Sequence, residues 1–128
     1  MGRILNRVEV KNATHPEYAR TFDALVDTGA SMLTLPLAWK GDFGEMSQTR
    51  KSLVQLADQG TQEVEICGPV SIEIEGFPKT YGEVMFLDMR PTKGRYEPLL
   101  GYIPLEQAGI VVDMVGHTLK TAEHMDLK

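Results

Sequence analysis

The chain has 128 residues, a formal net charge of −5 at pH 7, 42% hydrophobic residues and 24% charged residues. These proportions are typical of a soluble globular protein and exclude a disordered or fibrous chain, and the length predicts a single domain over residues 1–128. The negative balance argues against nucleic acid as a partner, and no apolar run is long enough for a membrane helix or a signal peptide.

The first half of the chain predicts short strands. Residues 6–11 alternate apolar and polar side chains, and residues 24–26 form an apolar run that ends at an aspartate. Residues 47–57 fit the period of a helix and that of a strand equally well, so they receive no assignment. Residues 63–66 and 70–75 alternate again, which predicts two further surface strands.

The second half adds two core strands and one helix. Residues 84–87 and 110–112 are continuous apolar runs, a pattern typical of strands that are buried on both faces. Pro104 suits the first turn of a helix and Gly109 would end it, which predicts one short helix over residues 104–108. Together these elements predict an all-β barrel or sandwich.

One tripeptide in the chain carries chemistry. Asp27, Thr28 and Gly29 follow the apolar run 24–26, and Asp is a poor strand former, so its position needs a reason. Taken alone, the tripeptide would be an ordinary turn in which the Asp side chain bonds the local backbone. The apolar pattern that resumes over residues 33–36 favours an active-site loop instead.

Two segments resemble the signatures of the retropepsin-like aspartic proteases of clan AA. Residues 24–36, ALVDTGASMLTLP, resemble the active-site strand of that family, and residues 98–105, PLLGYIPL, resemble its second signature. The resemblance spans roughly residues 5–120. It implies an all-β fold, a closed β-barrel that corresponds to one half of an acid protease, with one short helix near 104–108, working as a homodimer. Viral members usually have Arg where this chain has Tyr102, so the ion pair made there should be absent or replaced.

The resemblance implies a role for each residue of the first signature. Asp27 would be the catalytic carboxylate and would pair with Asp27 of a second copy, because the chain contains a single Asp-Thr-Gly. Two carboxylates in contact share one proton, so one can accept a proton from water while the other donates to the substrate carbonyl. Thr28 would bond the other chain across the two-fold axis, and Gly29 would allow that approach. Ala30 and Ser31 would contact the substrate.

A retropepsin also needs a hairpin that closes over its substrate. Residues 57–61 are turn-like and precede the alternating strand that begins at Glu63. Taken alone, this segment would be a plain surface hairpin. With the first signature in place, Asp58, Gln59 and Gly60 are predicted to bind an extended peptide that adds as a β-strand.

The remaining chemistry-bearing residues predict neither a metal site nor a cofactor. His15, His117 and His124 lack the spacing of metal ligands. Cys67 is the one cysteine, so it cannot form a disulfide within the chain and is expected to be a small buried residue. A chain that needs no disulfide is expected in the cytoplasm.

Three functional classes stay open. The leading prediction is a homodimeric aspartic endopeptidase that hydrolyses peptide or protein substrates. The alternative is a catalytically silent domain of the same fold that dimerises or binds peptides, and the weakest is an unrelated small β-barrel binding module. The first is favoured because every residue of the Asp-Thr-Gly motif is present, and the step from fold to activity is made by analogy.

Overall fold

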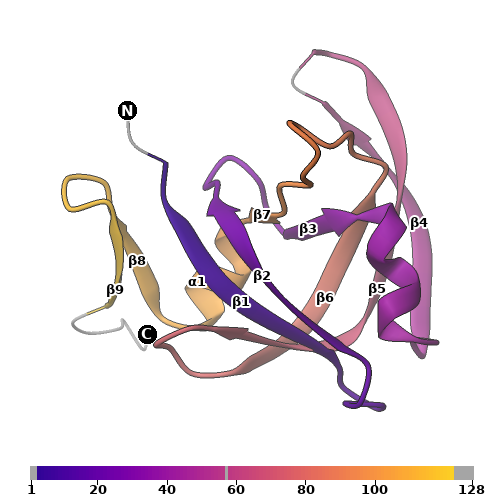
Figure 1. Cartoon of the computed structure of the whole chain (residues 1–128), viewed down its shortest axis with the longest axis horizontal. Helices are drawn as coiled ribbons and strands as arrows, with labels where there is room; N and C mark the ends of the chain where they lie inside the picture. The colour runs from indigo at the N-terminus through magenta and orange to yellow at the C-terminus, as the bar shows by residue number, and fades with distance from the viewer. Residues whose placement is uncertain (1–2, 57, 123–128) are drawn as a thin grey trace, which may run out of the picture.

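The computed structural model describes residues 3–56 and 58–122, and its main element is a seven-stranded sheet with the order β1-β2-β7-β3-β6-β5-β4 (Figure 1). The strands are β1 (Leu5–Asn12), β2 (Ala19–Val26), β3 (Leu33–Pro36), β4 (Gln48–Gln55), β5 (Thr61–Ile74), β6 (Thr80–Leu87) and β7 (Leu99–Leu100). Because β1 also pairs with β5, six of these strands close into a barrel and β4 lies outside it. The predicted all-β closed barrel is confirmed.

Two helices and a separate hairpin complete the fold. They are the 3-10 helix η1 (Leu37–Phe43), the helix α1 (Tyr102–Gln107), and the strands β8 (Ile110–Asp113) and β9 (Thr118–Thr121), which pair with each other. The predicted helix exists, but it begins two residues earlier than expected, and Gly109 follows it with a φ of 70°. Helix η1 was not predicted. Within the described residues, no helix has the length and apolar character needed to cross a membrane.

The inward-facing residues of the strands fill the barrel. The side chains with the least exposure include Val8, Val10, Leu33, Leu35, Val70, Ile72, Ile74, Val84, Phe86 and Leu100. Removal of this apolar surface from water is the main force that stabilises a fold of this kind. Cys67 is also fully buried, as expected from the sequence.

Two strand predictions in the middle of the chain were incomplete. Residues 63–66 and 70–75 were expected to be separate strands, but they belong to the single strand β5. The register of β5 against β6 shifts between Cys67 and Val70, so a bulge lets the strand bend while it stays paired. Residues 47–57, which had no assignment, contain β4, and seven of its eight residues are exposed.

The two runs that were expected to be buried on both faces are not. In β6, Val84 and Phe86 are buried, whereas Met85 and Leu87 are half-buried. In β8, Val111 is 47% exposed. A continuous apolar run therefore has a different cause in each place: one face of β6 borders a cleft, and β8 belongs to a hairpin outside the barrel.

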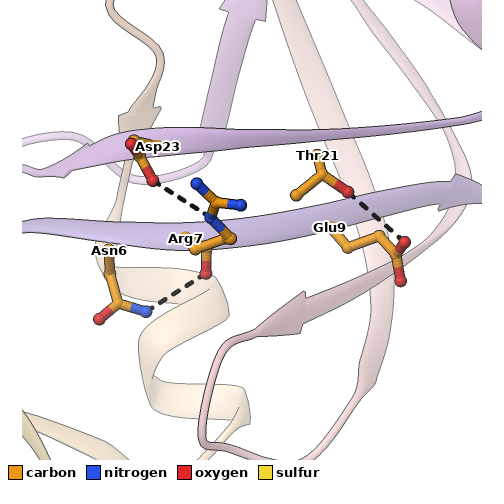
Figure 2. A network of polar contacts seen from close by, with 5 residues as sticks. All are labelled: Asn6, Arg7, Glu9, Thr21 and Asp23. Atoms are coloured by element: carbon orange, nitrogen blue, oxygen red, sulfur yellow. Dashed lines mark hydrogen bonds and ion pairs between the residues drawn. The ribbon is translucent and has the colours of Figure 1, made fainter.

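Polar side chains pair across β1 and β2 on the outer face of the barrel (Figure 2). The Arg7 Nε and Asp23 Oδ1 atoms lie 3.6 Å apart, and the Thr21 hydroxyl donates to Glu9 Oε2 at 3.5 Å. Asn6 Nδ2 donates to the carbonyl of Arg7 at 3.3 Å. Exposed contacts of this kind stabilise a fold little, but the charged face fixes which side of the strands turns outward.

Candidate active site

Asp27 lies directly after β2, where the chain leaves the barrel. Strand β2 pairs in parallel with β7, and β7 pairs antiparallel with β3. The Asp27 amide donates to the Leu100 carbonyl at 3.0 Å, which continues the β2–β7 ladder by one residue. The loop of residues 27–32 therefore crosses over β7 on its way from β2 to β3, and its start is fixed by backbone hydrogen bonds.

Gly101 supports this loop through close backbone contact. The Tyr102 amide, at the start of α1, donates to the Ala30 carbonyl at 3.0 Å. A Cβ atom on Gly101 would lie 2.6 Å from the Met32 carbonyl oxygen, so no side chain fits there. The glycine of the second sequence signature thus has a structural reason: it lets α1 begin directly against the Asp27 loop.

The Asp27 side chain is oriented by its own loop. The Oδ1 atom of Asp27 accepts a hydrogen bond from the Gly29 amide at 3.0 Å, and the backbone carbonyl of Asp27 accepts one from the Ala30 amide, also at 3.0 Å. A Cβ atom on Gly29 would lie 3.2 Å from Oδ1, which is a tight contact. Asp27 is half-buried and Thr28 is exposed, so the carboxylate remains accessible to a ligand.

Asp27 borders a cleft of about 450 Å³. Apart from Asp27, Gly29, Ala30 and Ser31, the lining residues are mainly apolar: Met32, Thr34, Val54, Gln55, Leu56, Met85, Leu87 and Leu99. Among the described residues that line the cleft, Asp27 is the one carboxylate. A mainly apolar cleft around a single charged group is typical of a site that binds a ligand through apolar side chains and acts on it at one point.

The β4–β5 hairpin forms one wall of the cleft and extends beyond the barrel (Figure 1). At its tip the Leu56 amide donates to the Gly60 carbonyl at 2.8 Å, and the Gly60 amide donates to Asp58 Oδ1 at 3.0 Å. Gln59 has a φ of 70°, so the left-handed position of the turn is Gln59 and not Gly60. Ala57, which belongs to the expected flap segment, lies outside the described residues.

The structure gathers some of the predicted site residues and separates others. Asp27, Gly29, Ala30 and Ser31 all line the cleft. Thr28 does not: together with Asp27 it borders a second hollow of about 190 Å³, which is also lined by residues of β8 and of the N-terminal segment. This arrangement turns the Thr28 side of the loop away from the cleft.

The three predicted flap residues are not part of the cleft lining. Asp58, Gln59 and Gly60 are exposed at the tip, and the hairpin residues that line the cleft are Val54, Gln55 and Leu56. The sequence signal for two of these lining residues was that Val54 and Leu56 are apolar residues within the unassigned segment 47–57.

Two further lining residues were missed on β6. Met85 and Leu87 were predicted as core residues because they belong to a continuous apolar run. Residues that are buried in a core and residues that contact a ligand in a cleft are both apolar, so the sequence pattern does not distinguish them.

A turn close to the Thr28 side of the loop contains a carboxylate with a perturbed pKa. The amide of Gly116 donates to Asp113 Oδ1 at 2.9 Å and that of Val115 at 3.1 Å, and Lys120 Nζ lies 2.9 Å from Oδ2. The Gly116 hydrogen bond, followed by the Lys120 contact, holds the pKa of Asp113 below its ordinary value. The ionised carboxylate therefore organises the β8–β9 turn.

Within residues 3–56 and 58–122, no group of three or more His, Cys, Asp or Glu side chains could hold a metal ion. His15 and His117 lie in separate turns, and His124 falls outside the described residues.

Comparison with known proteins identifies the fold. No protein family and no curated protein matches the sequence. Among solved structures, the EIAV protease complexed with the inhibitor HBY-793 matches with a TM-score of 0.61 and 18% sequence identity, over 84% of this chain and 89% of that chain. The fold is that of a retropepsin. At this level of identity the likeness concerns the architecture alone.

Proposed function

We propose that this protein is a homodimeric aspartic endopeptidase in which Asp27 and its copy in a second chain activate water for peptide hydrolysis. One observation carries the proposal: the Asp27 carboxylate lies at the floor of a mainly apolar cleft, in a loop fixed by Leu100 and Gly101, below a long exposed hairpin. A carboxylate held this way in a retropepsin-like fold suits acid–base chemistry on a peptide.

The proposed mechanism uses the pair of carboxylates as a unit. Because two carboxylates in contact cannot both be ionised easily, they share one proton. The ionised member removes a proton from a water molecule as it attacks the scissile carbonyl, and the protonated member donates to the carbonyl oxygen. The Gly29 amide, which bonds Asp27 Oδ1, keeps the carboxylate in place, and the exposed Thr28 would bond the loop of the partner subunit.

A second chain is required because the sequence contains a single Asp-Thr-Gly. The apolar residues beside the Thr28 side of the loop support this part of the proposal. Val112 and Met114 line the hollow that Asp27 and Thr28 share, and Val115 in the same hairpin is 95% exposed. Apolar side chains that are exposed next to a half-complete site fit a self-complementary, two-fold interface.

The substrate would be an extended peptide bound between the floor of the cleft and the β4–β5 hairpin. Apolar side chains of the peptide would fill the space lined by Val54, Leu56, Met85 and Leu87. The backbone at the hairpin tip, around Asp58–Gly60, would close over the peptide as an added strand.

The buried, unpaired Cys67 supports the cytoplasmic location that the sequence suggests, since the barrel forms around a free thiol.

The direct test is the variant Asp27→Asn, assayed with a diverse peptide library read by mass spectrometry. The amide is nearly isosteric with the carboxylate but cannot act as a base, so cleavage should fall at least about a thousandfold while the fold is retained. Residual cleavage by pure variant above that level would contradict the role of Asp27. Absence of cleavage by the wild-type protein, with peptide binding retained, would favour the catalytically silent module of the same fold.

A further inference from the structure

The loop between β6 and β7, residues 88–98, lies at the edge of the cleft. We name it the basic loop for the three cations described below. Leu87 precedes it and Leu99 follows it, and both of these residues line the cleft. Gln62, in the β5 arm of the hairpin, donates through Nε2 to the carbonyl of Asp88 at 3.2 Å. The basic loop is the orange segment between β6 and β7 in Figure 1, and the Gln62 contact joins it to the β4–β5 hairpin close to the hairpin tip.

The basic loop contains most of the unpaired positive charge of the described chain. Eight of the twelve Lys and Arg residues in the described part form an ion pair there. The four without such a partner among the described residues are Lys79, Arg90, Lys93 and Arg95, and the last three all lie in the basic loop. All three are exposed. A chain with a net charge of −5 therefore presents a local cluster of cations beside its cleft.

The acidic residues of the same loop do not cancel this charge. Glu97 forms an ion pair with Arg3, outside the loop. Asp88 is exposed at the start of the loop, where its carbonyl bonds the hairpin. Three cations against one carboxylate without such a partner leave the basic loop positive.

The tip of the basic loop has a defined shape. Thr92 and Arg95 exchange two backbone hydrogen bonds of 2.7 and 3.0 Å, and the two residues between them are Lys93 and Gly94, with φ values of 53° and 76°. This is the geometry of a tight two-residue hairpin turn. The ring of Tyr96 packs edge-on against the indole ring of Trp39 in η1, with 6.1 Å between the ring centroids. Lys93 and Arg95 are thus carried by a hydrogen-bonded turn, which lowers the entropy cost of binding an anionic group, and Arg90 precedes this turn by two residues.

We propose that the basic loop selects peptide substrates that carry Asp or Glu a few residues from the scissile bond. The inference rests on the proposed function, since it places the peptide in the same cleft. An extended peptide advances about 3.3 Å per residue, so acidic residues beyond the apolar centre pass the rim where the basic loop lies. The two-fold axis of a homodimer repeats the loop at the other end of the peptide. Opposite charges at the rim accelerate association and favour such peptides over neutral ones.

The test compares two fluorogenic peptides with the same apolar centre, one with Glu and one with Gln at the flanking positions on both sides. The ratio of their kcat/KM values is measured for the wild type, for the triple variant Arg90→Gln, Lys93→Gln, Arg95→Gln, and for the control Lys79→Gln. Lys79 is the matched control because it is also without an ion-pair partner among the described residues, but it lies at the other end of β6, roughly 25 Å along the strand from Leu87. Binding of both peptides to each protein is measured in parallel by fluorescence anisotropy.

We expect the wild type and Lys79→Gln to prefer the Glu peptide about tenfold at about 0.02 M salt, with a ratio that falls toward one at about 0.5 M salt. The triple variant should show a ratio close to one at both concentrations. Equal cleavage of both peptides by the wild type, or a triple variant that keeps the preference, would overturn the inference and leave the endopeptidase proposal intact. Cleavage of neither peptide would reject the endopeptidase proposal, and the anisotropy ratios would then decide the inference: a preference lost in the triple variant supports it, and equal binding overturns it.

Discussion

Gly101 is the residue on which the position of Asp27 depends most directly. A side chain at this position would meet the backbone of residues 30–32, which in turn connects to the Asp27 carbonyl through the Ala30 amide. Backbone atoms cannot move aside as a flexible side chain can. Any residue larger than glycine must therefore displace either α1 or the Asp27 loop.

We predict that Gly101→Ala destabilises the protein by about 1–3 kcal/mol, as expected of an overpacked site, and lowers kcat/KM further than the loss of folded protein explains. The measurements are thermal unfolding and activity per folded chain. Gly41→Ala is the control, because a Cβ atom at Gly41 would meet no atom within 4 Å. An unfolding midpoint equal to that of the wild type would show that the loop does not depend on this contact.

At the scale of single residues, the sequence predicts a position most clearly where one residue has one physical reason. Asp27 stands out because Asp is a poor strand former and directly follows an apolar run, whereas Gly101 was marked by the resemblance of residues 98–105 to the second signature. Met85 and Leu56 could not be found in this way. Their side chains are apolar and line a cleft. A sequence pattern indicates that such a side chain avoids water, but it does not indicate whether the core or a ligand covers it.

At the scale of elements, the β4 arm of the β4–β5 hairpin is held by little apolar packing. The residues of β4 are almost all exposed, so little apolar packing opposes its movement. This also explains why residues 47–57 could not be assigned from sequence: a strand exposed on both faces has no reason to alternate. The sequence also predicted two strands where the structure has the single strand β5, because the bulge between Cys67 and Val70 breaks the alternation that marks a strand.

We predict that Gly60→Val leaves stability within about 0.5 kcal/mol of the wild type but reduces turnover. A Cβ atom at Gly60 would approach Asp58 Oδ1 to 3.1 Å, and that exposed side chain can move aside. The added bulk would, however, stand between the hairpin tip and a bound peptide. Thermal midpoint and kcat/KM measured on the same preparation test this. Unfolding of the variant with unchanged turnover per folded molecule would assign Gly60 a structural role instead.

The β8–β9 hairpin should respond to acid through Asp113. Its pKa is lowered in the folded state, so the ionised carboxylate stabilises the hairpin fully above the ordinary value of 3.8, and this contribution is lost as the pH falls through the lowered pKa. We predict that the Val115 and Gly116 amides lose protection in hydrogen exchange below about pH 3.8, and that Asp113→Asn shows reduced protection at neutral pH. Equal protection in both proteins at pH 7 would rule out this role for the carboxylate.

At the scale of the whole molecule, the proposed two-carboxylate site is half-complete in one chain and lies beside apolar residues that are exposed to solvent. Val111, Met114 and Val115 belong to the β8–β9 segment and are exposed, as is Tyr102, which the resemblance to the second signature matches to the usual Arg of viral members. Without that Arg, the interface would depend on apolar contact more than on an ion pair. We therefore expect a dimer of moderate tightness that depends on the β8–β9 hairpin.

We predict that activity per chain falls on dilution in parallel with the dimer fraction, because one Asp27 cannot form the shared-proton pair. Light scattering and kcat/KM measured over one concentration series test this. Val115→Lys would place a charge at a residue that is 95% exposed in the single chain, and it should raise the dissociation constant of the dimer at least about tenfold. Tyr81→Lys is the control, since Tyr81 is 63% exposed near the start of β6, at the end of that strand away from the cleft. Full activity per chain in a preparation shown to be monomeric would refute the paired mechanism. A Val115→Lys protein that dimerises as tightly as the control would leave the mechanism standing but move the interface away from this hairpin.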